Sequence, residues 1–130
     1  MAEIAGVILA GGRATRMGGG DKGLLPLGRA TLLDHVIDRL GRQCASLARN
    51  ANGDAGRFAR FGLPVVADAR DDFPGPLAGV LAGMDWAAAR GMAAIVTVAA
   101  DTPFFPRDLV AGLRRAAAEA GAPIALAASP

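Results

Sequence analysis

Residues 7–25 read VILAGGRATRMGGGDKGLL. An apolar run passes into a segment that contains six glycines together with Lys22, the only lysine among 14 basic residues. Because lysine occurs nowhere else, Lys22 is not generic surface charge. Glycine lets backbone N–H groups approach phosphate oxygens, and cations offset the charge of those oxygens. The stretch therefore predicts a buried strand that opens into a polyphosphate-binding loop.

The order of residues in this loop excludes two common phosphate-binding motifs. It lacks the Gly-Lys-Ser/Thr of a P-loop, and it lacks the G-x-G-x-x-G order of a dinucleotide-binding turn. The segment from Gly11 to Lys22 is long enough to surround a whole triphosphate. Lys22 would contact phosphate oxygens as a point charge and Arg16 as a planar fork, whereas Arg13 is better explained as a solvated loop residue.

The bulk composition is that of one globular domain, which we assign to residues 1–130. Of the 130 residues, 52% are hydrophobic and 20% are charged, which is enough apolar material for a packed core. A net charge of only +2 and the absence of tyrosine argue against a nucleic-acid-binding surface. The single cysteine, Cys44, excludes an internal disulfide and a cysteine-rich zinc site.

The sequence contains neither a candidate membrane-spanning segment nor a signal peptide. No apolar run approaches the roughly 18 residues that a membrane span needs. The N-terminus also lacks the basic region and cleavage site of a signal peptide. We therefore expect a cytoplasmic protein, which we take to be a monomer without a membrane or nucleic-acid partner.

Apolar periodicity predicts strands that alternate with helices. Short apolar runs end in Gly, Asn or Asp, and most of the segments between them repeat apolar residues at helical spacing. Thr31 followed by Asp34 resembles a capping box at the start of a helix. The expected strands or extended pieces cover residues 4–10, 24–27, 45–49, 63–67, 93–99 and 124–128, and the expected helices cover residues 31–40, 54–61, 76–90 and 107–120.

This alternation is typical of a doubly wound, Rossmann-like α/β fold. A mainly parallel sheet would lie between two layers of helices, in a three-layer α/β/α arrangement with right-handed connections. The chain stops just after the strand expected at residues 124–128. We therefore expect that the domain is C-terminally truncated and that the natural chain continues beyond residue 130.

In such sheets, ligands bind beyond the carboxyl ends of the strands. Read in order, the expected strands end at Gly11-Gly12, Asn50, Asp68 and Asp101. These residue types also end strands simply because they form turns, but four such ends on one edge favour a binding site. Asp101 follows a buried apolar strand, where an isolated carboxylate is costly. Magnesium shared with substrate phosphates would offset that cost, and an N-cap role is the alternative.

Three short motifs make the chain resemble a known family. LAGG at residues 9–12, RMG at 16–18 and DK at 21–22 look like the signature of nucleotidyltransferases that activate sugars and pterins. Within that group the chain most resembles the molybdenum cofactor guanylyltransferases of the MobA type. The resemblance runs from Ile4 to about Leu113, and it includes Asp-Thr-Pro at 101–103 and the glycine-proline loop at 73–79.

The resemblance implies a role for each matching residue. It implies GTP as co-substrate, with the catalytic positions at Lys22, Arg16 and Asp101, and with Asp101 as the ligand of Mg²⁺. The nucleotide-binding positions that it implies are Leu9, Ala10, Gly11, Gly12, Lys22, Asn50, Asp68 and Asp101.

The reaction implied by the resemblance is transfer of GMP from GTP to the phosphate of molybdopterin, or of its molybdenum form, with release of pyrophosphate. No credible Ser/His or Cys/His pair is present, and in-line attack by the pterin phosphate needs no protein nucleophile. Cofactor-insertion proteins are the expected partners. Family members usually continue well past residue 130, with segments that bear on the pterin substrate, so residues that bind the pterin are expected beyond residue 130.

Two alternatives stay open at this level. One is another nucleotidyltransferase, such as a molybdopterin cytidylyltransferase or a sugar-phosphate NTP transferase. The other is a nucleotide-binding module without catalytic activity.

Overall fold

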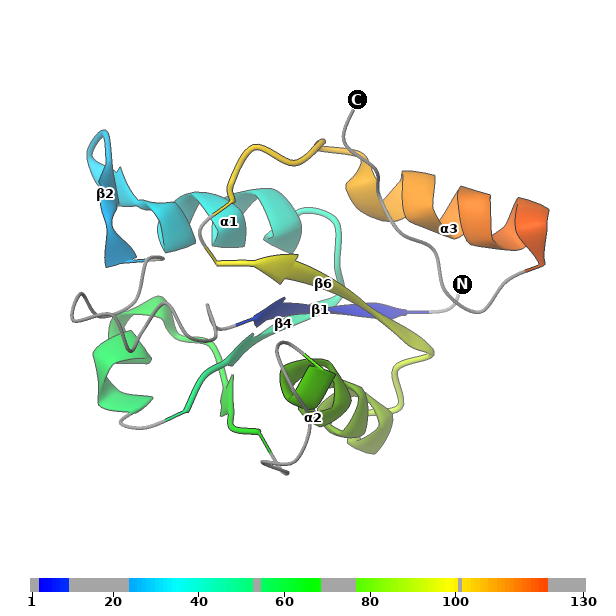
Figure 1. Cartoon of the computed structure of the whole chain (residues 1–130), viewed down its shortest axis with the longest axis horizontal. Coiled ribbons are helices and arrows are strands. Elements are labelled where there is room, and N and C mark those ends of the chain that lie inside the picture. The colour runs from blue at the N-terminus through cyan, green and yellow to red at the C-terminus, as the bar shows by residue number, and fades with distance from the viewer. Residues whose placement is uncertain (1–2, 10–23, 53–54, 69–76, 101, 122–130) are drawn as a thin grey trace.

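The computed structural model describes residues 3–9, 24–52, 55–68, 77–100 and 102–121. Within these ranges the centre of the fold is a four-stranded parallel sheet in the order β5-β4-β1-β6 (Figure 1). Its strands are β1 (Ile4–Leu9), β4 (Ser46–Asn50), β5 (Val65–Val66) and β6 (Ala94–Ala99). The strands run in the same direction, so the predicted mainly parallel α/β sheet is confirmed.

β1 lies inside the sheet because nearly every one of its residues is apolar and buried. It pairs with β4 on one side, with Ile8 opposite Arg49, and with β6 on the other, with Leu9 opposite Ala99. Strands that helices cover on both faces read as continuous apolar runs rather than as alternating ones. The IAGVIL sequence of β1 follows that rule.

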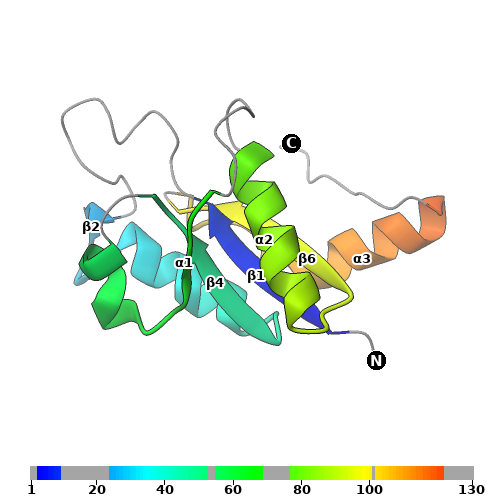
Figure 2. The same cartoon turned by 90° about the horizontal axis from the view of Figure 1, so that it is seen from below.

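Helices cover both faces of the sheet, as a three-layer arrangement requires. α1 (Leu32–Gly41) and α3 (Leu109–Ala120) lie on one face, and α2 (Leu77–Ala89) lies on the other (Figures 1 and 2). α1 joins β1 to β4, whereas α2 joins β5 to β6. The chain therefore changes face as it changes its winding direction, which is what a doubly wound fold does.

α1 begins where the sequence predicts. The Thr31 hydroxyl accepts a hydrogen bond from the Asp34 N–H at 3.1 Å, and the Asp34 carboxylate accepts one from the Thr31 N–H at 2.8 Å. This reciprocal pair is the capping box expected from the sequence. At the other end of the fold, Gly121 closes α3 in a left-handed conformation with a φ of 63°, also as predicted.

Four elements differ from the prediction in type or by more than one residue at a boundary, and the other predicted elements that the structure describes lie within one residue of it. The extended piece at 24–27 is β2 (Pro26–Leu27), and it forms a small antiparallel hairpin with β3 (Ala30–Thr31). The helix expected at 54–61 is the 3-10 helix η3 (Ala55–Phe61). β5 keeps two residues of the run expected at 63–67, and α3 begins at Leu109 rather than at residue 107. The strand expected at 124–128 lies outside the described residues.

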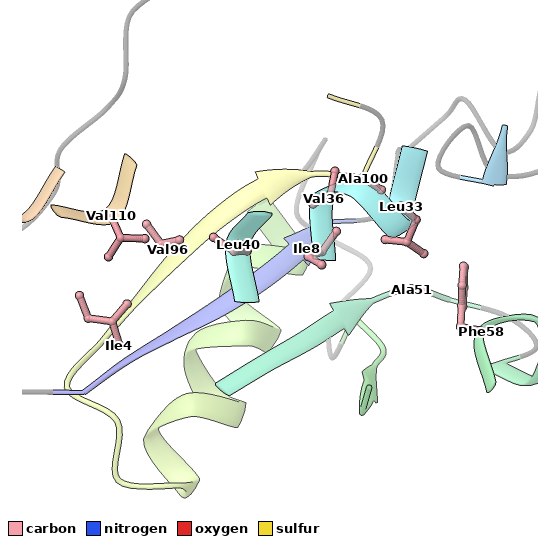
Figure 3. Close-up of a cluster of buried hydrophobic side chains, with 10 residues drawn as sticks. All are labelled: Ile4, Ile8, Leu33, Val36, Leu40, Ala51, Phe58, Val96, Ala100 and Val110. Carbon is pink, nitrogen blue, oxygen red and sulfur yellow. The ribbon is translucent and has the colours of Figure 1, made fainter. Parts of the chain in front are cut away.

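The main hydrophobic core lies between the sheet and the layer formed by α1 and α3. Figure 3 shows the cluster extending from Ile4, at the amino end of β1, to Ala51 and Phe58 beyond the end of β4. Leu33, Val36 and Leu40 occupy the apolar face of α1 and are at most 1% exposed. The cluster extends to the edge of the sheet where the strands have their carboxyl ends, so buried side chains pack against that edge.

Candidate functional site

The carboxyl ends of the parallel strands meet at one edge, and three predicted site residues lie there. Leu9 ends β1, Asn50 ends β4, and Asp68 follows β5 by two residues. Leu9 pairs with Ala99 at the end of β6. In the sequence, the glycine-rich segment follows Leu9, and Asp101 comes two residues after Ala99. In the chain, the predicted phosphate-binding segment and the predicted metal ligand therefore follow two strands that are neighbours in the sheet.

The winding of the sheet reverses beside β1. From β1 the chain moves outward to β4 and β5, and α2 then returns it to β6 on the other side of β1. In open α/β sheets the ligand crevice forms at such a switch point, outside the carboxyl ends of the strands. The switch lies between β1 and β6, next to the positions that the sequence assigns to phosphate and metal binding.

Asn50 is nearly fully buried, with 3% of its surface exposed. Its Nδ2 donates to the carbonyl oxygen of Val66 at 3.1 Å and to Oδ1 of Asp68 at 2.8 Å. Both partners are acceptors only, so the amide nitrogen must face them. The orientation of the amide is therefore fixed by the end of β5 and by Asp68.

A second amide holds the other side of the Asp68 carboxylate. Nδ2 of Asn52 donates to Oδ2 of Asp68 at 3.0 Å, and the Asp68 N–H donates to Oδ1 of Asn52 at 2.9 Å. Each carboxylate oxygen thus accepts one side-chain amide, from Asn50 or from Asn52. A carboxylate has about four lone-pair sites, so acceptor capacity remains on both oxygens.

Gly79, in the first turn of α2, lies directly against the Asn50 side chain. A Cβ at this position would overlap Oδ1 of Asn50, and it would lie 2.9 Å from Cγ of Asn50 and 3.2 Å from Cδ2 of Leu9. Glycine is therefore required by close approach, because no side chain fits between the helix and the strand ends. It allows α2 to cover Asn50 and Leu9 from one face.

Arg49 lies beneath this edge with 1% of its surface exposed. Its Nη1 donates to the carbonyl oxygens of Ile8 at 3.1 Å and Asn50 at 3.0 Å, and its guanidinium lies 4.8 Å from the centre of the Phe58 ring. Arg49 therefore joins the ends of β1 and β4. It also places a buried positive charge below the edge that the sequence assigns to an anionic ligand.

The segment that follows Asp101 is attached to α1. Nη1 of Arg39 donates to the carbonyl oxygen of Phe105 at 2.6 Å, and Nε2 of Gln43 donates to that of Pro106 at 3.3 Å. Oε1 of Gln43 also accepts the N–H of Val110 at 2.9 Å, in the first turn of α3. These bonds hold residues 105–110, which follow the predicted metal ligand in the sequence, against α1.

Six of the predicted site residues lie outside the described part of the chain, and the structure leaves their positions as predictions: Ala10, Gly11, Gly12, Arg16, Lys22 and Asp101. Elsewhere in the described ranges, no three His, Cys, Asp or Glu side chains group closely enough to hold a metal ion. None of the helices built from described residues is long and apolar enough to cross a membrane.

The family model described as the MobA-like NTP transferase domain matches residues 6–130. The chain belongs to this family. The family resemblance drawn from the motifs at residues 9–22 is therefore confirmed.

Curated relatives in the family share more than half of the aligned residues. A protein of Mesorhizobium japonicum named molybdenum cofactor guanylyltransferase is 55% identical over 128 residues, covering 98% of this chain and 62% of its own length. One of the same name from Rhodopseudomonas palustris strain BisB5 is 58% identical over 125 residues, covering 95% and 60%. This chain therefore spans about 60% of the length of these relatives.

Solved structures of similar fold include mycobacterial proteins. The homologue of Mycobacterium tuberculosis Rv0371c from Mycobacterium sp. strain JC1 superposes with a TM-score of 0.66 at 28% identity, covering 88% of this chain and 59% of that one. Rv0371c itself, in a complex with manganese, gives 0.54 at 28% identity, covering 92% and 59%.

Three residues at the site were not predicted from the sequence: Arg49, Asn52 and Gly79. Asn52 carried a usable signal, because it repeats the asparagine of Asn50 at the next position on the same side of an extended chain. Gly79 belongs to the glycine-proline motif at 73–79 that supports the resemblance, and it is a glycine inside a helical pattern, which sometimes marks close packing. Neither signal indicated that Gly79 contacts Asn50. Arg49 carried no signal, since a charged residue in a short strand normally faces solvent.

Proposed function

We propose that this chain is the nucleotide-binding domain of a molybdenum cofactor guanylyltransferase, with residues 1–130 forming that domain. The whole protein would transfer GMP from GTP to the phosphate of molybdopterin or of its molybdenum form, releasing pyrophosphate. The names of the relatives, at 55% and 58% identity, support the activity. The observation in the structure that supports it most strongly is the hydrogen bond from the buried Asn50 amide to the half-buried Asp68 carboxylate at the carboxyl edge of the sheet.

The chemistry of Asp68 suits a guanine base. Guanine presents two neighbouring N–H donors, N1–H and the N2 amino group, to a partner in its plane. Adenine presents an acceptor, N1, next to its amino group, and a carboxylate would repel that acceptor. With one acceptor site on each oxygen already used by an amide, the remaining sites of Asp68 would accept the two guanine donors in parallel. Asn50 would orient the carboxylate and contact the nucleotide.

The phosphates would bind beside the end of β1. Leu9, Ala10, Gly11 and Gly12 would offer main-chain groups, and Lys22 and Arg16 would neutralise the triphosphate. These cations would also stabilise the charge that develops on the departing pyrophosphate. The buried guanidinium of Arg49, donating to the carbonyl oxygen of Ile8, would add to the positive potential at this strand end.

Asp101 is the residue that would hold a magnesium ion, and the donor chemistry fits. Magnesium binds protein through one or two carboxylates and completes its shell with phosphate oxygens and water. Asp101 comes directly after Ala100, which is 3% exposed and follows the end of β6 beside the switch point. β6 is not the buried strand that the sequence predicted, because Val96 is the only one of its six residues that is buried. When bound there, the ion would neutralise phosphate charge and favour in-line displacement at the α-phosphorus.

The direct test is to incubate the purified full-length protein, including the part beyond residue 130, with GTP, magnesium and molybdopterin and to assay both the guanine dinucleotide and pyrophosphate. Formation of both products supports the proposal. Activity with CTP or with a sugar phosphate instead would indicate another nucleotidyltransferase. Binding of GTP without release of pyrophosphate would indicate a non-catalytic module. Either result would refute the proposed reaction.

Variants would test the assigned residues. Lys22→Ala should lower turnover by at least about tenfold, because a contact to developing charge is worth more than about 1.4 kcal/mol. Asp101→Ala should abolish magnesium-dependent activity and leave the thermal unfolding curve close to wild type. Arg90→Ala is the control: this arginine stacks over the Trp86 ring at 5.3 Å, on α2 and the turn after it, and its loss should leave turnover unchanged.

A further inference from the structure

Asn52 makes a two-point contact with Asp68 that the proposed reaction does not by itself explain. Its Nδ2 reaches Oδ2 of the carboxylate at 3.0 Å, and its Oδ1 accepts the main-chain N–H of Asp68 at 2.9 Å. One side chain thus holds both the backbone and the carboxylate of the same residue. The main-chain bond fixes the Asn52 amide relative to Asp68, and the carboxylate is then held at Oδ2 by Asn52 and at Oδ1 by Asn50.

The main-chain ladder of the sheet ends before it reaches Asp68. β5 contains only Val65 and Val66, and the last described main-chain bond between the two segments runs from the N–H of Ala51 to the carbonyl oxygen of Val66 at 3.1 Å. The bond from the Asp68 N–H to Asn52 is the next rung along, made by a side chain instead of a carbonyl. Asn52 therefore extends the β4–β5 connection to the residue that needs to be held.

We propose that Asn52 is a positioning residue for base recognition, which holds the Asp68 carboxylate in the orientation that accepts the N1–H and N2 amino group of guanine. This inference rests on the proposed function, because it assigns Asp68 to the base of the nucleotide. Asn50 holds Oδ1 from the buried side and Asn52 holds Oδ2 from the exposed side. The carboxylate is thereby organised before the ligand arrives, and no rotational freedom is lost on binding.

A purely structural role for Asn52 makes a different prediction. Asn52 is exposed, so replacing it should have a small effect on unfolding. If it served the fold alone, any effect on nucleotide affinity would be equal for all purine nucleotides. If it orients Asp68, the loss should be largest for the nucleotide that offers both donors. Inosine triphosphate lacks the N2 amino group and retains N1–H, so it separates the two roles.

The experiment measures dissociation constants of GTP, ITP and ATP by calorimetric titration, in the presence of magnesium, for the wild-type protein and two variants. In Asn52→Ala the affinity for GTP should fall about tenfold, which corresponds to about 1.4 kcal/mol. The affinity for ITP should fall less, so the preference for GTP over ITP narrows. Asn52→Asp keeps the shape and the acceptor for the Asp68 N–H, but places a carboxylate oxygen against Oδ2. It should lose at least as much GTP affinity as the alanine variant.

Cys44→Ser is the matched control. Cys44 lies near the amino end of β1, beside Gly6, so a hydroxyl there destabilises the fold at the opposite edge of the sheet. It should leave the ratio of GTP to ITP affinity at the wild-type value. If Asn52→Ala and Asn52→Asp also keep that ratio while the wild-type protein prefers GTP, the positioning role is wrong and the proposed function stands. If the wild-type protein binds GTP no more tightly than ATP, the assignment of guanine itself fails.

Discussion

Replacing Gly79 with alanine should weaken both the fold and the nucleotide site, although alanine is the better helix former. In an exposed helix interior, glycine to alanine gains about 1 kcal/mol of stability. At position 79, however, the new Cβ would overlap Oδ1 of Asn50 and would lie 3.2 Å from Cδ2 of Leu9. Asn50 is 3% exposed and has a short side chain, so it has little room to move aside.

The cost follows from the two hydrogen bonds that Asn50 would lose. Its Nδ2 bonds to Val66 and to the Asp68 carboxylate are 3.1 Å and 2.8 Å long. A neutral hydrogen bond contributes about 1 kcal/mol and one to a charged group about 2 kcal/mol. Subtracting the helix-propensity gain leaves a net destabilisation of about 2 kcal/mol. The dissociation constant for GTP should also rise about tenfold, because the displaced amide no longer orients Asp68.

Gly112→Ala in α3 is the matched control, because a Cβ there meets nothing within 4 Å. It should stabilise the protein by about 0.5–1 kcal/mol and leave GTP binding unchanged. Urea unfolding monitored by circular dichroism gives the two free energies, and titration with GTP gives the two affinities. If Gly79→Ala stabilises the protein as much as Gly112→Ala does and binds GTP normally, the close approach of α2 to Asn50 matters neither for stability nor for GTP binding, and the reasoning is wrong.

Three further predictions concern other parts of the fold. The Arg60 guanidinium lowers the pKa of Asp34 to about 2, so Asp34→Asn should cost about 1 kcal/mol at pH 7, reduced by the solvent exposure of Arg60. That difference from wild type should disappear in urea titrations as the pH falls from about 4 to about 2, and a difference that persists at the acid end would contradict it. Burial raises the pKa of Cys44 to about 11, so alkylation by iodoacetamide at pH 8 should be about 100-fold slower in the native protein than in urea; equal rates would refute this. Arg49→Met should destabilise the fold by about 2–4 kcal/mol, because it leaves the carbonyl oxygen of Ile8 without the guanidinium that binds it, and a wild-type unfolding midpoint would show that the buried charge contributes nothing.

The sequence predicted the order of the elements because local signals agreed with one another. β1 is a continuous apolar run, α1 has a capping box at Thr31, and α3 ends at Gly121 with a positive φ. Boundaries failed where tertiary contacts decide them. β5 is limited by its pairing with Arg49 and Asn50, and the segment expected to be a short helix before Phe61 forms a tighter 3-10 turn.

The candidate site was predictable to the extent that strand ends are predictable. Asn50 and Asp68 were expected at one edge, and they lie 2.8 Å apart between Nδ2 and Oδ1. Which side chains surround them was not predictable, since the contact between Gly79 and Asn50 joins elements that lie far apart in the chain. Likewise, the burial of Arg49 depends on the Phe58 ring and on the end of β1, which no local pattern reports.

The central place of β1 has a consequence for how the nascent protein acquires its shape on the ribosome. β1 is synthesised before the other three strands of the sheet, and its two neighbours, Ser46–Asn50 and Ala94–Ala99, follow later in the chain. The apolar strand β1 therefore leaves the ribosome long before β6, its second neighbour in the sheet, has been translated. During that interval it presents an unpaired, hydrophobic edge of the kind that chaperones recognise.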